Sequence, residues 1–196
     1  MEKKKKIILT SYGLTTTVGR TLIEKELAKD GDLSDKRIFL FQEPYYSFES
    51  MMVEACLKMN FKKENIILSG QQKSNEELIN FDYIYVTEGN TFEVCSLLRE
   101  RKLDVVIKEA VGNGATYIGA SAGAMIAGVS IEEALSFDRN FVRMDDFEGL
   151  HLFDGIVIPH YTKSELKRYI KNSPGIEEKY SKIFSVSNEG ILVLKD

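Results

Sequence analysis

Cysteine is scarce in this chain, and positive charge is not in excess. The 196 residues include only two cysteines, Cys56 and Cys95, which lie far apart and form no Cys-x-x-Cys pair. The sequence therefore does not support zinc binding or thiol redox chemistry, and we expect both thiols to be buried as small apolar side chains. The net charge of −4 is not that of a nucleic-acid-binding surface, so we expect no nucleic-acid partner.

Long apolar runs are also missing. No stretch reaches the roughly 18 apolar residues that a membrane-spanning helix needs. The lysines at 3–6 lead into the short apolar run 7–9, which is too short for the core of a signal peptide. We therefore expect a cytoplasmic protein without a membrane partner. The hydrophobic content of 43% and the length are typical of one globular domain over residues 1–196.

Short apolar strands alternate with helical patterns along most of the chain. The expected strands are Lys6–Ser11, Arg37–Phe41, Asn65–Leu68, Tyr83–Val86 and Thr116–Gly119, with helices around 17–29, 48–60, 91–112 and 122–129. This alternation predicts an α/β fold, a three-layer sandwich whose mostly parallel, flavodoxin-like sheet carries helices on both faces. Three later strands are closer together and are expected to pair antiparallel at an edge. They are Ile156–Ile158, Ile183–Val186 and Ile191–Leu194.

The most informative segment is the Gly-x-Ser-x-Gly sequence at 119–123. An apolar strand precedes it and small helix-forming residues follow, an order typical of a nucleophile elbow with a serine at the apex. Glycines suit such a turn because they allow unusual dihedral angles and close backbone approach. Ser121 is therefore the candidate nucleophile, although small residues also recur where a helix simply packs on a strand.

A serine hydroxyl needs a base to take its proton, and the chain offers only two histidines. His160 follows Pro159 at the end of an apolar run, which places it at the carboxyl end of an expected strand, where open α/β sheets bind ligands. His151 lies between loop-like and apolar residues, a setting more typical of a surface or hydrogen-bonded core histidine. His160 is therefore the candidate base.

The turn after the strand Tyr83–Val86 supplies a candidate oxyanion hole. Gly89 exposes backbone N–H groups near the start of a helix that Asn90 or Thr91 can cap. We expect the N–H groups of Gly89 and Ala122 to converge on the negative charge of a tetrahedral intermediate. An ordinary capped turn between strand and helix is the alternative interpretation.

Three segments together resemble the signature segments of the peptidase E-like serine peptidases, family S51. They are Gly89-Asn90-Thr91-Phe92, Gly119-Ala120-Ser121-Ala122-Gly123-Ala124 and Pro159-His160-Tyr161. That family includes aspartyl dipeptidases and cyanophycinases and shares its fold with the class I glutamine amidotransferases. The resemblance implies Ser121 as nucleophile, His160 as base, and Gly89 with Ala122 as the oxyanion hole. It also implies no cofactor and is compatible with a homodimer.

The acid that would orient His160 stays open between two candidates. The resemblance implies an aspartate between the serine and the histidine, and Asp138 matches that placement best. Some members carry a glutamate near the C-terminus, and Glu189 resembles that position. A carboxylate that holds the imidazole needs only spatial proximity, so we rank Asp138 first and Glu189 second.

Two positions depart from the family pattern. Glu88 stands where a further glycine is usual, and it would repel an anionic substrate unless its carboxylate points away. Ala120 replaces a bulky aromatic residue before the serine. Both changes weaken a transfer of Asp-X specificity to this chain. The candidate substrate contacts are Asn90, Thr91, Arg139 and Tyr161, and an arginine can bind a carboxylate with two parallel hydrogen bonds.

The leading interpretation is a cofactor-free and metal-free serine hydrolase that cleaves a small peptide or amide bond through an acyl-enzyme. An esterase or thioesterase with the same groups is one alternative. A non-catalytic binding protein that keeps the fold is the other. The loop at 11–19 has two glycines but lacks the lysine of a phosphate loop, so a pocket wall or a capped turn is favoured over a nucleotide site.

Overall fold

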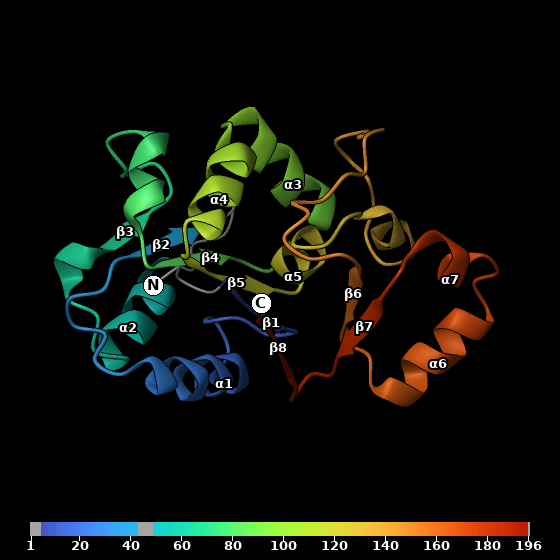
Figure 1. Ribbon diagram of the computed structural model, residues 1–196, viewed down its shortest axis with the longest axis horizontal. Helices are drawn as coiled ribbons and strands as arrows, with labels where there is room; N and C mark the ends of the chain where they lie inside the picture. Colours follow the sequence, from blue (N-terminus) through green and yellow to red (C-terminus); the bar gives the residue numbers. More distant parts are fainter. Residues whose placement is uncertain (1–4, 43–48, 196) are drawn as a thin grey trace.

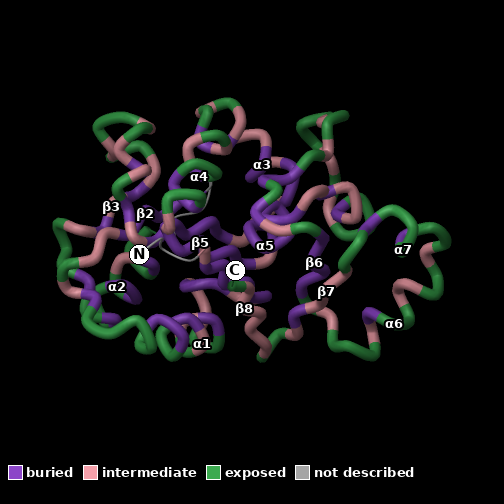
Figure 2. The backbone as a smooth tube through the Cα atoms, viewed as in Figure 1, coloured by how far each residue is buried: buried purple, intermediate pink, exposed green. Residues whose placement is uncertain are grey.

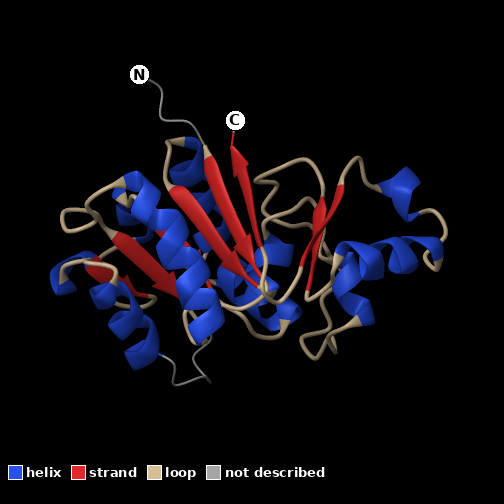
Figure 3. Ribbon diagram, turned by 90° about the horizontal axis from the view of Figure 1, so that it is seen from below, coloured by secondary structure: helices blue, strands red, loops and turns tan. Residues whose placement is uncertain are grey.

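The computed structural model describes residues 5–42 and 49–195, and its centre is a six-stranded sheet with the order β3-β2-β4-β5-β1-β8 (Figures 1 and 3). Its strands are β1 (Lys6–Thr10), β2 (Ile38–Phe41), β3 (Ile66–Leu68), β4 (Tyr83–Val86), β5 (Thr116–Ala120) and β8 (Ile191–Lys195). Every neighbouring pair is parallel except β1 and β8, which pair antiparallel. The predicted mostly parallel sheet is confirmed.

Helices cover both faces of this sheet. The helices α1 (Thr17–Leu27) and α2 (Glu49–Lys58) lie on one face, and α3 (Thr91–Glu100) and α4 (Leu103–Gly112) lie on the other (Figure 1). The strands of the central sheet are largely buried (Figure 2). Alternate strand residues point to opposite faces, so two buried clusters form. Ile8, Leu40, Tyr85 and Ile118 pack towards α1 and α2, and Ile7, Phe39, Ile84 and Tyr117 pack towards α3 and α4. The predicted three-layer α/β fold is confirmed.

The helix predicted over 91–112 is in fact two helices. Lys102, between α3 and α4, adopts a left-handed conformation with φ of 56°, which interrupts the helical path. Asn75 donates a hydrogen bond to the freed carbonyl of Arg101 (2.6 Å). The helix predicted over 122–129 is shorter than expected, since α5 covers only Ala122–Ile126. The first residue of the helix predicted over 48–60 lies outside the described residues.

Short 3-10 helices complete the local structure. They are η1 (Ala28–Asp30), η2 (Lys63–Asn65), η3 (Asn75–Asn80) and η4 (Glu132–Ser136).

The last strands differ from the prediction. β8 does pair antiparallel at an edge of the central sheet, but β6 (Ile156–Pro159) and β7 (Ile183–Val186) pair with each other, in parallel, in a separate two-stranded sheet. Parallel strands need a long crossover, and α6 (Lys163–Lys171) and α7 (Ile176–Lys179) supply it. Neither helix was predicted, although Thr162 and Glu165 form a capping box that marks the start of α6.

A buried hydroxyl joins the two sheets. Ser11 follows β1 and is 1% exposed. Its Oγ donates a hydrogen bond to the carbonyl of Val186 in β7 (2.6 Å) and accepts one from the backbone N–H of His160 after β6 (2.8 Å). Val157 and Val186 of the small sheet also belong to the buried cluster beneath α3 and α4. The extent of the domain, 1–196, stays a prediction.

Both cysteines are buried, as expected. Burial raises the pKa of the Cys56 thiol to about 12 and that of Cys95 to about 11, so neither is a thiolate near neutral pH. Within the described ranges, no helix combines the length and the apolar character that a membrane crossing requires.

The replacement Ser11→Ala is expected to lower the free energy of unfolding by about 1–3 kcal/mol, because it leaves the buried Val186 carbonyl and the His160 N–H without their partner. Urea unfolding measures the change. Ser34→Ala is the matched control, since the half-buried Ser34 hydroxyl donates to the exposed carboxylate of the nearby Asp32 (2.8 Å). Equal stability of the two variants would show that the Ser11 junction contributes nothing.

Candidate active site

Ser121 occupies the sharp turn between β5 and α5. Its φ of 48° and ψ of −105° are unusual for a residue with a side chain, and such strain is characteristic of functional sites. The Ser121 N–H donates to the carbonyl of Thr10 at the end of β1 (2.9 Å), and the Ser121 carbonyl accepts from the N–H groups of Ala124 and Met125. The turn is therefore fixed by backbone hydrogen bonds on both sides.

The two glycines of the elbow are required by close packing. A Cβ on Gly119 would lie 2.5 Å from the carbonyl oxygen of Gly123, and a Cβ on Gly123 would lie 2.2 Å from the carbonyl oxygen of Val86. The buried Tyr117 hydroxyl donates to the Gly123 carbonyl (2.7 Å) from below. The Gly-x-Ser-x-Gly pattern therefore follows from the approach of α5 to β4 and β5.

His160 lies at the end of β6 and meets Ser121 across the gap between the two sheets. Its Nε2 lies 3.0 Å from Ser121 Oγ. The Tyr12 ring packs edge-on against the imidazole with a centroid separation of 5.4 Å, and Ser11 holds the His160 N–H. The structure thus brings together the serine and the histidine that the sequence singled out.

The other imidazole nitrogen contacts Asn188, a residue that was not among the predicted site residues. His160 Nδ1 lies 2.7 Å from Oδ1 of Asn188, in the turn between β7 and β8. The two predicted acids lie elsewhere. Asp138 Oδ2 accepts hydrogen bonds from the N–H (2.9 Å) and the hydroxyl (2.6 Å) of Thr91. Glu189 is exposed, and within the described part of the chain it has no side-chain hydrogen bond or ion pair.

The loop after β4, which we call the oxyanion loop after its predicted role, has an unusual backbone conformation at Gly89. Gly89 has a φ of 146°, a conformation that side chains rarely allow. Asn90 caps α3 and accepts hydrogen bonds from the N–H groups of Phe92 (3.1 Å) and Glu93 (3.2 Å), which confirms the predicted cap. Ala122 is the first residue of α5, and the first N–H groups of a helix have no acceptor within it.

The elbow and this loop are directly connected. The N–H of Gly123 donates to the carbonyl of Thr87 (3.2 Å), just before Gly89. This hydrogen bond therefore fixes the two backbone segments of the candidate oxyanion hole relative to each other.

Most of the candidate substrate contacts bind other parts of the protein. Asn90 Nδ2 donates to the carbonyl of Arg139 (2.9 Å), and Thr91 is buried against Asp138. The half-buried Tyr161 ring packs edge-on against Phe137. Residues 137–139 therefore contact both the oxyanion loop and the segment that carries His160. The Arg139 side chain is exposed, and its contact with substrate stays a prediction.

Glu88 binds to the loop that follows β1. Its carboxylate accepts hydrogen bonds from the hydroxyls of Thr15 and the fully buried Tyr85, the latter at 3.2 Å. A Cβ on Gly13 would lie 2.1 Å from Glu88 Oε2, so this carboxylate depends on a glycine there. The same loop ends in a helix cap, since Thr16 accepts a hydrogen bond from the Gly19 N–H (3.0 Å). The interpretation of a capped turn is confirmed.

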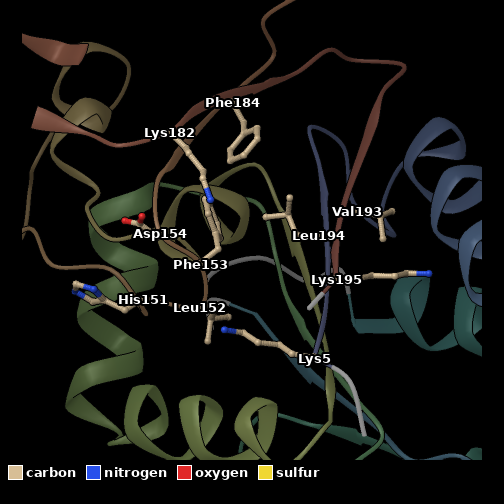
Figure 4. A pocket seen from close by; sticks show the side chains of 10 residues that line it. All are labelled: Lys5, His151, Leu152, Phe153, Asp154, Lys182, Phe184, Val193, Leu194 and Lys195. Carbon is tan, nitrogen blue, oxygen red and sulfur yellow. The ribbon is translucent and has the colours of Figure 1, made fainter. Parts of the chain in front are cut away.

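His151 is exposed and lies near the amino ends of β1 and β5, away from Ser121. It lines a cavity of about 530 Å³ between the small sheet and β8, together with Lys5 and Lys195 (Figure 4). Lys6 pairs with Lys195 in β8 and with Thr116 in β5, so this cavity lies at the amino end of β1 and β5. Ser121 follows the other end of β5. The cavity therefore does not contain the Ser121–His160 pair.

The fold and the site define an α/β protein with a serine at a strained strand–helix turn and a histidine at hydrogen-bond distance from it. The model of peptidase family S51 matches residues 43–196, and the chain belongs to that family. An uncharacterized peptidase of Listeria innocua is 32% identical over 117 residues, which cover 59% of this chain and 56% of the relative. Peptidase E of Haemophilus influenzae is 32% identical over 124 residues, which cover 63% and 55%. The chain spans little more than half the length of these relatives.

Solved structures show the same fold. A protein described as a candidate peptidase E from Listeria monocytogenes EGD-e superimposes with a TM-score of 0.68 at 23% identity, over 98% of both chains. A peptidase from an acI-B1 actinobacterium gives a TM-score of 0.64 at 18% identity, over 99% of this chain and 85% of the other.

Asp138→Ala is expected to lower the free energy of unfolding by about 1.5–3 kcal/mol, because it removes a charged acceptor from the N–H and the hydroxyl of Thr91. Thermal or urea unfolding measures the loss. Asp145→Ala is the control, since Asp145 is an exposed acid of the same connection. If both variants match the wild type, Asp138 does not hold the oxyanion loop.

Proposed function

We propose that this chain is a serine peptidase that cleaves a short peptide through an acyl-enzyme. The observation that carries the proposal is the 3.0 Å separation between Ser121 Oγ and His160 Nε2 at the apex of a strained elbow. A hydroxyl becomes an effective nucleophile when a base at hydrogen-bond distance takes its proton. Both groups come from the carboxyl ends of strands, where α/β sheets bind their ligands.

The reaction follows from this arrangement. His160 takes the Ser121 proton as Oγ attacks the substrate carbonyl carbon, and the backbone N–H groups of Gly89 and Ala122 stabilise the resulting oxyanion. The imidazolium then donates its proton to the leaving amine, which leaves an acyl group on Ser121. Water, activated by His160, hydrolyses the ester and restores the free serine.

Two features support a peptide substrate over the alternatives. The relatives that the chain matches are described as peptidases, which favours an amide bond over an ester or thioester. The direct contact between Ser121 and His160 favours catalysis over binding alone. Glu88 does not argue for a decayed site, because its carboxylate is bound by Thr15 and Tyr85.

The peptide specificity is expected to differ from that of enzymes with an aromatic residue before the serine. Ala120 is fully buried, and a Cβ added to Gly13 would lie 2.9 Å from the Ala120 Cβ. A bulky aromatic side chain has no room there, because the loop after β1 covers this position.

Ser121→Ala is expected to lower kcat/KM by about 10⁴-fold or more, since it removes the nucleophile. The measurement is hydrolysis of an aminoacyl-p-nitroanilide panel that includes aspartyl, leucyl and alanyl members. Labelling by a fluorophosphonate is expected in the wild type and absent in Ser121→Ala.

Ser164→Ala is the matched control, since the exposed Ser164 hydroxyl lies beside Thr162 in the first turn of α6. It is expected to keep wild-type rates and labelling. A wild-type protein that neither reacts with the fluorophosphonate nor cleaves any member faster than Ser121→Ala would exclude the serine mechanism.

A further inference from the structure

We propose that a neutral amide, that of Asn188, positions the imidazole of His160, and that neither Asp138 nor Glu189 does so. The proposal rests on the proposed function, because it concerns the base of the same reaction. It departs from the expectation of a carboxylate in that role, and it makes Asn188 a positioning residue that acts through His160.

The two contacts of the imidazole determine where its proton lies. Oδ1 of Asn188 can only accept a hydrogen bond, so the 2.7 Å contact requires the proton on Nδ1 of His160. Nε2 then carries a free lone pair and faces Ser121 Oγ at 3.0 Å. This is the tautomer that a general base needs. In the opposite tautomer Nε2 carries a hydrogen that points at Oγ. Nε2 then has no free lone pair and cannot take the serine proton.

No carboxylate contacts the imidazole among the described residues. The side chains that hydrogen-bond to His160 or pack against its ring are those of Ser11, Tyr12, Ser121 and Asn188, and none of them carries a carboxyl group.

Neither of the two candidate acids forms a hydrogen bond with His160 in the described part of the chain. Asp138 binds the N–H and the hydroxyl of Thr91 at the start of α3, where a carboxylate favours the helix. Glu189 follows Asn188 in the turn and is exposed to solvent. The two acids therefore differ from Asn188 in location, and their variants can be compared with it.

Asn188 is exposed, so water competes for its amide, and the backbone must hold it in place. The turn is closed by a hydrogen bond from the Gly190 N–H to the Ser187 carbonyl (2.9 Å). On one side the Val186 carbonyl is bound by Ser11. On the other side Ile191 pairs with Thr10, at the end of β1 where the elbow also attaches. The same strand end thus fixes the turn and Ser121.

A neutral amide and a carboxylate have different effects on the base. Both can hold the ring in one tautomer, but the full negative charge of a carboxylate stabilises the imidazolium that His160 forms much more strongly than the dipole of an amide oxygen does. Asn188 therefore supplies orientation with a weaker stabilisation of that charge. Replacing it by Asp adds the charge at the same position, whereas replacing it by Ala removes the orientation.

The tautomer can be measured without any activity assay. The exposed His151 is replaced by Gln, which leaves one imidazole, and two-dimensional ¹H–¹⁵N spectra then report which ring nitrogen of His160 is protonated. We expect the Nδ1–H tautomer with the Asn188 amide present, and the Nε2–H tautomer, which neutral histidine favours in water, in Asn188→Ala. An Nε2–H tautomer with Asn188 present, or an Nδ1–H tautomer that persists in Asn188→Ala, would overturn the proposal.

The kinetics of three variants distinguish a role of the Asn188 amide from a role of the neighbouring Glu189 carboxylate. Asn188→Ala is expected to lower kcat by about 10²-fold with little change in KM, as a misaligned base does. Asn188→Asp is expected to keep substantial activity and to move the acidic limb of the kcat/KM profile to higher pH by about one unit or more, because a carboxylate favours the protonated imidazole. Glu189→Gln is expected to keep the wild-type rate and limb.

Glu189 would be the positioning residue instead if Glu189→Gln lowered kcat and moved the acidic limb of the kcat/KM profile to lower pH, while Asn188→Ala kept the wild-type kcat and profile. These outcomes are distinguishable from failure of the proposed function. If the wild type is not labelled by the fluorophosphonate, the serine mechanism fails, while the spectra still test the Asn188 contact. If the wild type is labelled and Asn188→Ala has the wild-type kcat, only the inference about Asn188 fails.

Discussion

The hydroxyl group of Ser11 fixes the distance on which the candidate active site depends. Ser121 belongs to the central sheet and His160 to the separate two-stranded sheet, so no shared ladder of hydrogen bonds holds them together. Ser11 bridges that gap by binding the backbone of both β7 and the segment after β6. A hydroxyl can donate and accept at once, which an alanine or a valine at this place cannot do. This junction helps to hold Ser121 and His160 at their separation of 3.0 Å.

Three loops then support the site from different directions. Glu88 ties the oxyanion loop to the loop after β1, and Asp138 ties it to the connection before β6. The departure at Glu88 therefore has a structural explanation, since its carboxylate binds Thr15 and Tyr85. The turn that carries Asn188 approaches from a third side. Each of these contacts joins segments far apart in sequence, so the geometry of the site depends on the correct packing of the whole domain.

The sequence predicted those parts of the site that local chemistry determines. Gly119 and Gly123 could be predicted because only glycine tolerates the approach of neighbouring carbonyls. His160 could be predicted because the chain has a single other histidine. The contact of Asn188 with His160 could not be predicted, because the direction of a side chain in the β7–β8 turn depends on how β8 pairs with β1. The break at Lys102 was missed for a similar reason: neither glycine nor proline marks it, and a lysine adopts the left-handed conformation instead.

The position of β8 has a consequence for the order in which the protein matures. During synthesis β1 emerges long before β8, because the chain is made from its N-terminal end. The five parallel strands can assemble with the elbow in place while the final edge of the sheet is still missing. The turn with Asn188 is fixed only when β8 docks on β1. In a nascent chain Ser121 therefore emerges before Asn188, and the imidazole of His160 gains its contact with Asn188 only after β8 has docked.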